Sequence, residues 1–401
     1  MSTQLDLKIA EVVRSGNCTG CGACCLLDDG LRMEISDKGY SRPERRTAPS
    51  SAPDVADFDA ICPGVRVRAQ RPAGSVRHPL LGSSFGSWQA WATDPEIRER
   101  GSSGGTISAL VAWMLATGRV TESVGATKSP ETPLRTVSLT LRTREDVMAA
   151  AGSRYAPVSN AAIALVDRPD TAFVGKPCEV TAVRALADLR GGPGPVLLSF
   201  FCAGTPSQHA TDALVHQLVG EAKPVDLWYR GNGWPGEFTV IAEDGTRGTD
   251  SYDHSWGKQL GPTVQWRCKV CPDGVGESAD IVAADFWETD ENGYPLFAER
   301  AGVSALIART RRGVALIEEA FQEGVIEGEP LDLDALAAVQ PAQTDRRETL
   351  MARVAGARVA GRRAPKFEGF GFWRGLRGRP RMLVRIARGS HRRVRQGRAD
   401  G

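Results

Sequence analysis

The sequence lacks any continuous apolar run of about 18 residues, the length that a membrane-spanning helix needs, so we expect no such helix. Its first ten residues mix charges with leucines and contain no apolar core of a secretory signal. No internal repeat is present, and 401 residues are enough for two or three domains. We therefore expect a cytoplasmic protein. In that reducing compartment, clustered cysteines bind metal more often than they form disulfides.

The charge is close to balanced overall but unevenly distributed. Residues 345–401 contain 17 Lys/Arg against 4 Asp/Glu, which leaves 33 against 44 for residues 1–344. Such segregation usually separates a folded, here acidic, body from a basic interaction segment. We rank a solubilising arm, or a strap that docks on the acidic body, first for this basic tail. Peripheral contact with the inner face of a membrane ranks second, and nucleic acid ranks last.

Strand-like and helix-like patterns alternate through the middle of the chain, which predicts a mixed α/β (α+β) core. The predicted strands are 137–141, 171–175, 196–202, 225–230, 238–243, 280–286 and 303–309. The predicted helices are 107–115, 144–151, 177–189, 206–220 and 313–323. We divide the chain into a small N-terminal module (1–75) with little periodicity, two core units (76–160 and 161–344) and the basic tail (345–401).

The densest cysteine pattern lies in the N-terminal module. We define the first cysteine set as Cys18, Cys21, Cys24 and Cys62. Three cysteines at intervals of three, with a fourth from a distant Cys-Pro pair, are typical of [4Fe–4S] ligation. A zinc site is the alternative, but paired knuckles are the usual zinc pattern. Cys25 is adjacent to Cys24 and is not expected to join the same cluster.

A second group of cysteines lies in the core. We define the second cysteine set as Cys178, Cys202, Cys268 and Cys271. A four-ligand site at Cys268 and Cys271 needs two further thiols, and Cys178 and Cys202 would supply them. Taken alone, each of these two cysteines is better explained as a small buried hydrophobic residue, and only the completion of a four-ligand set favours the cluster. Cys178 begins a predicted helix beside Lys176, and both features stabilise a thiolate.

A glycine-rich turn precedes the first predicted helix of the core. The turn can bind an anion through backbone N–H groups and hydroxyls, although a plain helix start explains it equally well. It consists of Ser102, Ser103, Gly104, Gly105 and Thr106. Further along, Arg154 and Tyr155 offer a cation and an aromatic ring. Surface and core-edge positions are the alternative for these two.

Seven segments in this order resemble the coenzyme F420 hydrogenase/dehydrogenase beta-subunit family. The resemblance runs from about residue 15 to about 310 and depends on the ordered co-occurrence of the segments. They are 18–24 (CTGCGAC), 102–105 (SSGG), 152–155 (GSRY), 174–179 (VGKPCE), 201–207 (FCAGTPS), 268–271 (CKVC) and 279–285 (ADIVAAD).

The resemblance implies a flavoprotein in which one or two [4Fe–4S] clusters exchange electrons with FAD. It implies that residues 76–160 and 161–344 are the N- and C-terminal-type domains of the family. The glycine-rich turn would then lie against the flavin, with Lys176, Pro177 and Glu179 near its ring. The expected partners are coenzyme F420 or a ferredoxin-type electron carrier, and a partner subunit.

We therefore predict an iron–sulfur flavoprotein oxidoreductase that passes electrons on to coenzyme F420 or a small organic substrate. The alternatives are a non-catalytic electron-relay subunit, a ferredoxin-dependent reductase of a membrane-associated intermediate, and a zinc-stabilised binding module. No acid–base residue is predicted. Asp285 and His254 are candidates for which a structural role is the stronger reading.

Overall fold

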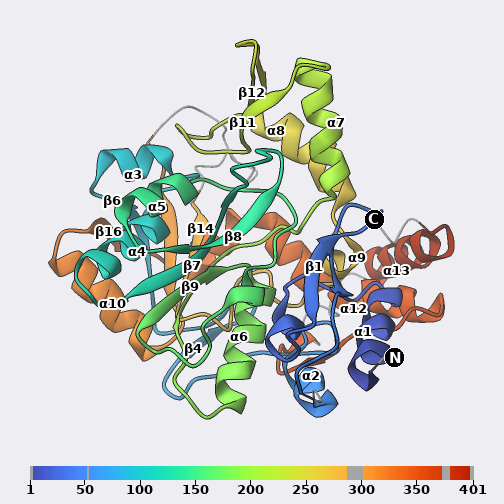
Figure 1. The fold of residues 1–401 in the computed structure, drawn as a ribbon. Helices are drawn as coiled ribbons and strands as arrows, with labels where there is room; N and C mark the ends of the chain where they lie inside the picture. The colour runs from blue at the N-terminus through green and yellow to red at the C-terminus, as the bar shows by residue number, and fades with distance from the viewer. Residues whose placement is uncertain (1–2, 52–53, 287–300, 373–379, 398–401) are drawn as a thin grey trace.

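The computed structural model describes residues 3–51, 54–286, 301–372 and 380–397. Within these residues the main sheet has the strand order β16–β6–β15–β14–β10–β9–β7–β8 (Figure 1). Its strands are β6 (Gly86–Ala92), β7 (Glu122–Lys128), β8 (Thr136–Leu141), β9 (Thr171–Gly175), β10 (Val196–Phe200), β14 (Ile281–Asp285), β15 (Ser304–Ala308) and β16 (Ile326–Pro330). The predicted mixed α/β fold class is confirmed. Three strands of this sheet, β6, β7 and β16, were not predicted.

The central strands end together at one edge of the sheet. β7, β9, β10 and β14 are parallel neighbours. β6 runs in the same direction, because β15 lies antiparallel between β14 and β6. The carboxyl edge of the sheet is therefore the edge where these five strands end. Open α/β sheets bind their ligands at such an edge.

Helices cover both faces of the sheet, and the alternation of side chains along a strand assigns each residue to one face. On β10, Leu198 packs in the core beneath α4, α5 and α10, whereas Leu197 packs on the opposite face with α6. These helices are α4 (Thr106–Ala116), α5 (Arg144–Ala150), α6 (Pro177–Leu189) and α10 (Arg311–Gln322). All four were predicted, with bounds that differ by a few residues.

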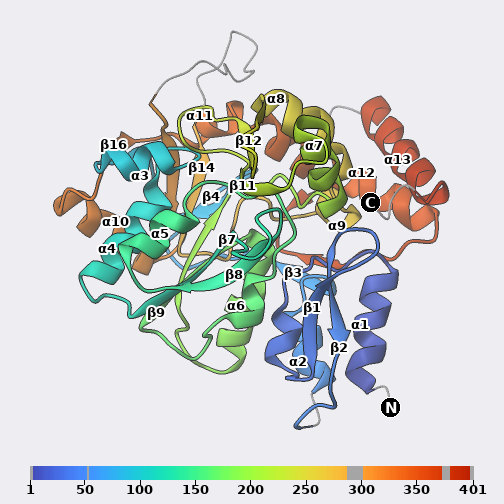
Figure 2. The same ribbon diagram turned by 45° about the horizontal axis from the view of Figure 1, so that its top comes forward.

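The N-terminal module contains more regular structure than its sequence indicates. It comprises α1 (Gln4–Arg14), η1 (Ala23–Leu26), the hairpin β1 (Leu31–Ile35) and β2 (Ser41–Arg45), and α2 (Val55–Ile61). A small core of Leu5, Ile9, Val12, Leu31 and Phe58 joins these elements. The module lies beside α6, where α2 contacts that helix (Figure 2).

A three-stranded antiparallel sheet forms a smaller layer above the carboxyl edge, together with α7. This layer consists of β11 (Pro224–Trp228), β12 (Phe238–Ala242), β13 (Arg247–Asp250), α7 (Gln208–Val219), α8 (Tyr252–His254) and the π-helical segment η3 (Ser255–Leu260). Short elements connect the layers: α3 (Pro95–Arg100), η2 (Asn160–Ile163), η4 (Gly261–Thr263), α9 (Trp266–Lys269) and the hairpin β4 (Val76–His78) and β5 (Gly82–Ser84).

The C-terminal part is folded onto the body. It contains α11 (Leu333–Ala338), α12 (Pro341–Val359), β17 (Lys366–Glu368) and α13 (Pro380–Arg395). β17 pairs in parallel with β3 (Arg66–Arg68). The boundary placed at residues 344/345 falls within α12, and neither α12 nor α13 was predicted. In the described residues no helix has the length and apolarity needed to cross a bilayer.

Candidate functional site

The first cysteine set comes from one short segment and the end of a helix. Cys18 and Cys21 follow α1, Cys24 lies in η1, and Cys62 ends α2 with an extended backbone, as the following Pro63 predicts. Gly22 has a φ of +89°, and a Cβ there would lie 2.8 Å from the Cβ of Ala162. This glycine thus allows the segment to approach η2.

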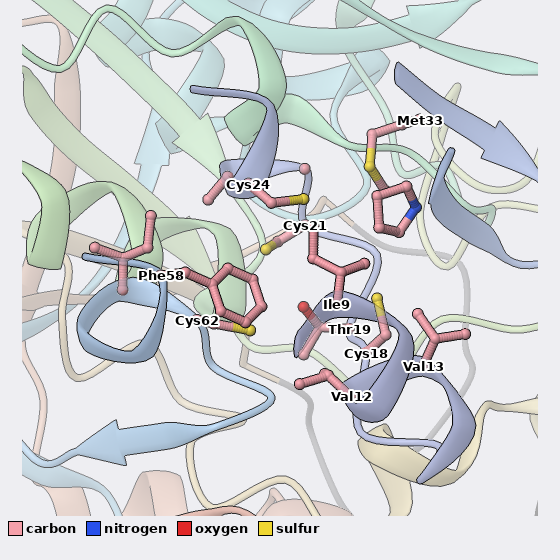
Figure 3. Close-up of a pocket in the computed structure, with 14 residues that line it drawn as sticks. Ile9, Val12, Val13, Cys18, Thr19, Cys21, Cys24, Met33, Phe58 and Cys62 are labelled. Atoms are coloured by element: carbon pink, nitrogen blue, oxygen red, sulfur yellow. The ribbon is translucent and has the colours of Figure 1, made fainter. Parts of the chain in front are cut away.

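The four thiols of the first cysteine set line one pocket. Figure 3 shows their sulfur atoms around a common space, among the apolar side chains of α1 and α2. A zinc ion would hold its thiolates at about 2.3 Å. Among the described residues, no three Cys, His, Asp or Glu side chains lie close enough to share one metal ion. Four thiols around one pocket with an apolar lining could hold a cluster of the [4Fe–4S] type.

The thiols of this pocket are poorly solvated. Burial raises the pKa of Cys21 to about 11. Burial, followed by the neighbouring thiols of Cys21 and Cys18, raises the pKa of Cys62. The pKa of Cys24 rises because of its hydrogen bond with Cys25, and burial adds to this rise. Thiolates crowded into an apolar pocket would need a positive charge between them, as a bound metal centre would supply.

The second cysteine set is assembled from three separate parts of the core. Cys178 lies in the first turn of α6, Cys202 follows β10, and Cys268 and Cys271 flank the end of α9. The Cys202 N–H donates to Gly274 O at 2.8 Å, which joins the second and third parts. Burial, followed by the nearby Cys268 thiol, raises the pKa of Cys202 to about 12.

The two cysteine sets are neighbours. Burial raises the pKa of Cys178, and this thiol also senses both Cys21 of the first set and Cys202 of the second. Gln265 connects the sets directly, because its Nε2 donates to Thr19 O at 2.9 Å and lies 3.6 Å from Cys268 Sγ. Centres held at the two sets would therefore be close to each other.

Buried side chains of α12 support the second cysteine set from outside. Arg346 Nη2 donates to Cys202 O at 2.7 Å, and Gln343 Nε2 donates to the same oxygen at 3.2 Å. Arg347 donates to Pro272 O at 2.9 Å and to Glu277 at 2.7 Å. Sequence reasoning missed these residues. Nothing in their spacing distinguishes a buried arginine from the exposed arginines nearby.

The glycine-rich turn lies at the carboxyl edge and is held by hydrogen bonds within the protein. Ser103 Oγ donates to Val303 O at 2.9 Å, and the Gly104 N–H donates to Ser304 Oγ at 2.9 Å. Ser153 Oγ donates to Ser102 Oγ at 2.7 Å, which brings the 152–155 segment to the turn. Gly105 adopts the left-handed backbone that precedes α4.

Thr106 differs from the serines of this turn in its hydrogen bonding. Its hydroxyl is buried and has no hydrogen-bond partner in the described part of the chain. A buried polar atom of this kind usually has a partner in the functional protein.

Arg154 and Tyr155 lie beside the turn but have protein partners of their own. The Arg154 guanidinium donates to Leu227 O and Pro133 O, both at 3.0 Å, and to Thr136 Oγ1 at 2.8 Å. Tyr155 packs against the rings of Tyr229, Tyr252 and Trp256. Protein acceptors therefore surround the Arg154 guanidinium, and Tyr155 belongs to an aromatic group at the edge of the sheet.

The two acid–base candidates have different surroundings. Asp285 ends β14 and pairs with the buried Arg230, with 2.6 Å between Oδ2 and Nη1. Arg230 in turn stacks on Trp234 and Tyr252. His254 pairs with Asp250 through Nδ1 at 2.7 Å and is half-exposed in the upper layer. Asp285 therefore lies at the carboxyl edge, and sequence reasoning missed its partner Arg230.

Lys176, Pro177 and Glu179 lie at the end of β9, next to the cysteine sets. Lys176 Nζ donates to Glu179 Oε1 at 2.6 Å and to Val158 O at 2.8 Å. Burial alone would lower the pKa of Lys176, but the Glu179 carboxylate and the Cys178 and Cys202 thiols raise it. Pro177 opens α6, as predicted. A buried cation thus stands beside Cys178 and Cys202.

Comparison with known proteins gives two adjoining matches. Residues 87–164 match the family model of the N-terminal part of the coenzyme F420 hydrogenase/dehydrogenase beta subunit. Residues 170–334 match the family model of the C-terminal part of the same subunit. The second cysteine set and the glycine-rich turn lie inside these matches, whereas the first cysteine set and α13 lie outside them.

Individual relatives agree with the family models. The coenzyme F420 hydrogenase subunit beta of Methanococcus voltae is 25% identical over 268 residues, which are 62% of this chain and 86% of the relative. The F420-dependent formate dehydrogenase 1 subunit beta of Methanococcus maripaludis is 25% identical over 247 residues, 59% of each chain.

Among solved structures, a chain of the F420-reducing [NiFe] hydrogenase complex from Methanosarcina barkeri has the same fold. The match has a TM-score of 0.53 at 22% identity and covers 70% of this chain and 95% of the other.

A mixed α/β core thus places two sets of four cysteines near each other. The chain belongs to the coenzyme F420 hydrogenase/dehydrogenase beta-subunit family, and the resemblance seen in the sequence is confirmed. The named relatives are subunits of F420-linked hydrogenases and dehydrogenases, which are oxidoreductases.

Proposed function

We propose that this protein is an iron–sulfur oxidoreductase subunit that passes electrons between two [4Fe–4S] clusters and FAD. Coenzyme F420 or a small organic substrate would exchange electrons with the flavin. The observation that carries the proposal is the pocket lined by the four thiols of the first cysteine set, next to the second cysteine set. Its relatives are named as beta subunits, which supports the proposal that this protein functions together with partner subunits.

The residues fit iron–sulfur clusters in number, type and environment. Each cysteine set offers four thiols, the ligand complement of one cubane. Gln265 contacts both Thr19 O and Cys268 Sγ, so clusters at the two sets would be close enough for an electron to pass between them. The cation of Lys176 stands beside the second set and would favour its reduced, more negative state. Clusters of this kind are expected in a reducing cytoplasm.

The carboxyl edge is the proposed flavin site. Ser102, Ser103, Gly104, Gly105 and Thr106 would face the cofactor, and the unpartnered Thr106 hydroxyl is the polar group that such a ligand would satisfy. Tyr155 and the Arg230–Asp285 pair stand at the same edge. A bound flavin would supply the conversion of single electrons into two-electron hydride chemistry.

A second candidate function is an electron relay without a flavin. It is favoured by the hydrogen bonds that already occupy Ser102, Ser103 and Gly104, and by the three acceptors that occupy Arg154. In this reading both cysteine sets carry iron, and a partner subunit binds the flavin. The two readings differ in one measurable quantity, the flavin content.

The test is an absorbance spectrum of anaerobically purified protein with counts of iron, sulfide, zinc and flavin. We expect a brown protein with about eight iron atoms and one flavin per chain, whose chromophores are bleached by reduced coenzyme F420. The same iron content with no flavin would support the relay. Zinc in place of iron, or a colourless protein, would refute both readings.

A further inference from the structure

Helix α13 is held on the body through its apolar and small side chains. It packs along α12, where Gly356 faces the Ala387 backbone and Ser390 is fully buried. Val394 joins the small core formed by Trp266, Val270 and Leu350. The basic segment is therefore a docked helix with a fixed outer face. Figure 2 shows α13 beside α12, on the side of the molecule that carries the N-terminal module.

The outer face of α13 is a row of arginines. Six of the 16 residues of the helix are arginine, none is acidic, and all six arginines are exposed. No carboxylate in the described residues forms an ion pair with any of them. We call this surface the arginine face; it consists of Arg381, Arg385, Arg388, Arg392, Arg393 and Arg395.

The arginine face lies close to the second cysteine set. Val394 of α13 packs with Trp266 and Val270, which stand two residues before Cys268 and directly before Cys271. Arg353 of α12 donates to Lys269 O at 3.2 Å, and burial, then Arg346 and Arg393, lower its pKa. Cations of α12 and α13 therefore extend to the loop that bears two thiols of the set.

We propose that the arginine face is the docking surface for a small acidic electron-carrier protein that exchanges single electrons with the centre at the second cysteine set. This inference rests on the proposed function, because it requires a cluster at that set. In each encounter one electron leaves the reduced carrier, which is oxidised, and the cluster is reduced by one electron, with no proton transferred. Charge complementarity would steer the carrier to the side where its centre comes nearest to the cluster.

The composition of the face distinguishes this partner from other polyanions. A membrane-surface helix needs a broad apolar face to insert. Helix α13, which lies within the described residues, strongly exposes a single large apolar side chain, that of Val384. Single-stranded nucleic acid needs exposed rings for stacking. The nearby Phe367 and Phe372 are half-buried, and Phe370 is buried beneath Arg347. An acidic protein surface requires only the charges that are present.

The experiment measures reduction of the iron-loaded full chain by a reduced acidic bacterial-type ferredoxin in a stopped-flow instrument. The variant Arg385→Glu/Arg388→Glu/Arg392→Glu reverses half of the face. We expect its second-order rate constant at low salt to fall at least about tenfold, and the wild-type rate to fall as salt rises. Arg385→Gln/Arg388→Gln/Arg392→Gln should give a smaller loss, and is the fallback if the reversal prevents folding.

The controls separate docking from cluster loss. Reduced methyl viologen is a small cation that does not need the arginine face. It should therefore reduce the variants as fast as the wild type, or faster. Arg247→Glu/Lys258→Glu changes exposed cations of the upper layer and should leave the ferredoxin rate unchanged.

Two kinds of result would overturn the inference. One is a ferredoxin rate that is indifferent to salt and to charge reversal while viologen reduces the protein normally, which would leave the proposed function standing. The other is arginine-face-dependent binding to phosphatidylglycerol vesicles or single-stranded RNA without any effect on ferredoxin. Protein that contains no iron would instead refute the proposed function itself.

Discussion

The two cysteine sets are built in opposite ways. Three members of the first set lie within seven residues of chain, and the fourth ends a nearby helix. The second set takes its members from α6, the end of β10 and α9, which only the folded sheet brings together. The first set can therefore be recognised from the spacing of its residues. The fold is needed to show that the members of the second set lie close together.

The surroundings of the two sets differ as much as their construction. The first set is enclosed by a module with a small apolar core, to which the cysteines themselves contribute. The second stands on the main sheet, which has large cores on both faces and its own buried ion pairs. Metal binding should therefore be coupled to folding in the N-terminal module and only weakly coupled to it in the sheet.

The largest expected effect is loss of the N-terminal module when its metal is lost. Cys62→Ser should remove about half of the iron and expose residues 1–68 to rapid proteolysis, while the core fragment persists. The buried Cys62 thiol closes the pocket, and the small core is not expected to hold without it. Limited proteolysis with mass spectrometry measures this. Cys271→Ser is the matched control and should lose iron without releasing the module.

The next largest effect is expected in the main sheet and not at the first cysteine set. Asp280 is buried, and its carboxylate accepts from Arg184 at 3.0 Å, Arg312 at 2.6 Å and the Leu197 N–H at 2.8 Å. Asp280→Asn leaves both arginines without a counter-charge and should cost about 3–5 kcal/mol in the free energy of unfolding. Urea unfolding followed by circular dichroism measures this, with Asp244→Asn in the exposed β12–β13 turn as the control.

The same carboxylate gives a pH dependence of stability. Burial alone would raise the pKa of Asp280, but Arg184 and Arg312 outweigh burial and lower it. A carboxyl whose folded pKa is depressed stabilises the fold above its unfolded pKa of about 3.9. That stability is lost as the pH falls through the lower folded value. The wild type should therefore lose more stability on acidification below about pH 4 than Asp280→Asn does. An equal loss in both proteins would contradict this assignment.

A smaller and more local effect is expected at Gly204. Its φ is +134°, and a Cβ would lie 3.1 Å from the Cβ of Cys268 and closer still to Val264. Gly204→Ala should cost about 1–3 kcal/mol and disturb the electron paramagnetic resonance signal of the second set, with the first unchanged. Gly191→Ala is the control, because Gly191 also has a positive φ but has no atom within 4 Å of its Cβ position. Equal effects of the two changes would argue against close packing at Cys268.

The smallest effect is expected at Cys25. It lies next to Cys24, and the hydrogen bond from Cys24 lowers its pKa, but it is not among the residues that line the pocket. Cys25→Ser should leave the iron content and the absorbance spectrum unchanged. A loss of iron comparable with that of Cys62→Ser would mean that the ligand set of the first cluster has been chosen wrongly.

Sequence patterns predicted those parts of the fold that repeat a period or end at a marked residue. The strands at 171–175 and 196–200 and the helix after Lys176 were found because apolar runs and Pro177 mark them. The hairpin β1–β2 was missed because Arg32, Glu34, Arg42 and Glu44 make its strands look like surface loops. The helices α12 and α13 were missed because arginines interrupt their apolar patterns. Some arginines of α12 become buried in the fold, whereas those of α13 face outward.

For the candidate site, the sequence predicted the thiols but not the residues that join them. Gln265 and Arg346 act through contacts between segments that are far apart in the chain, so no spacing reveals them. The same holds for Arg230, whose role depends on the position of Asp285 at the end of β14. The placement of a flavin against the glycine-rich turn stays a prediction.

The most direct test of the account is an iron and zinc count on anaerobically purified wild type, Cys21→Ser and Cys268→Ser, paired with Mössbauer spectra. Two independent clusters predict about eight iron atoms in the wild type and about four in each variant, with spectra of [4Fe–4S] centres in all three. Zinc as the bound metal, or a variant at either set that leaves the iron content of the wild type unchanged, would contradict it.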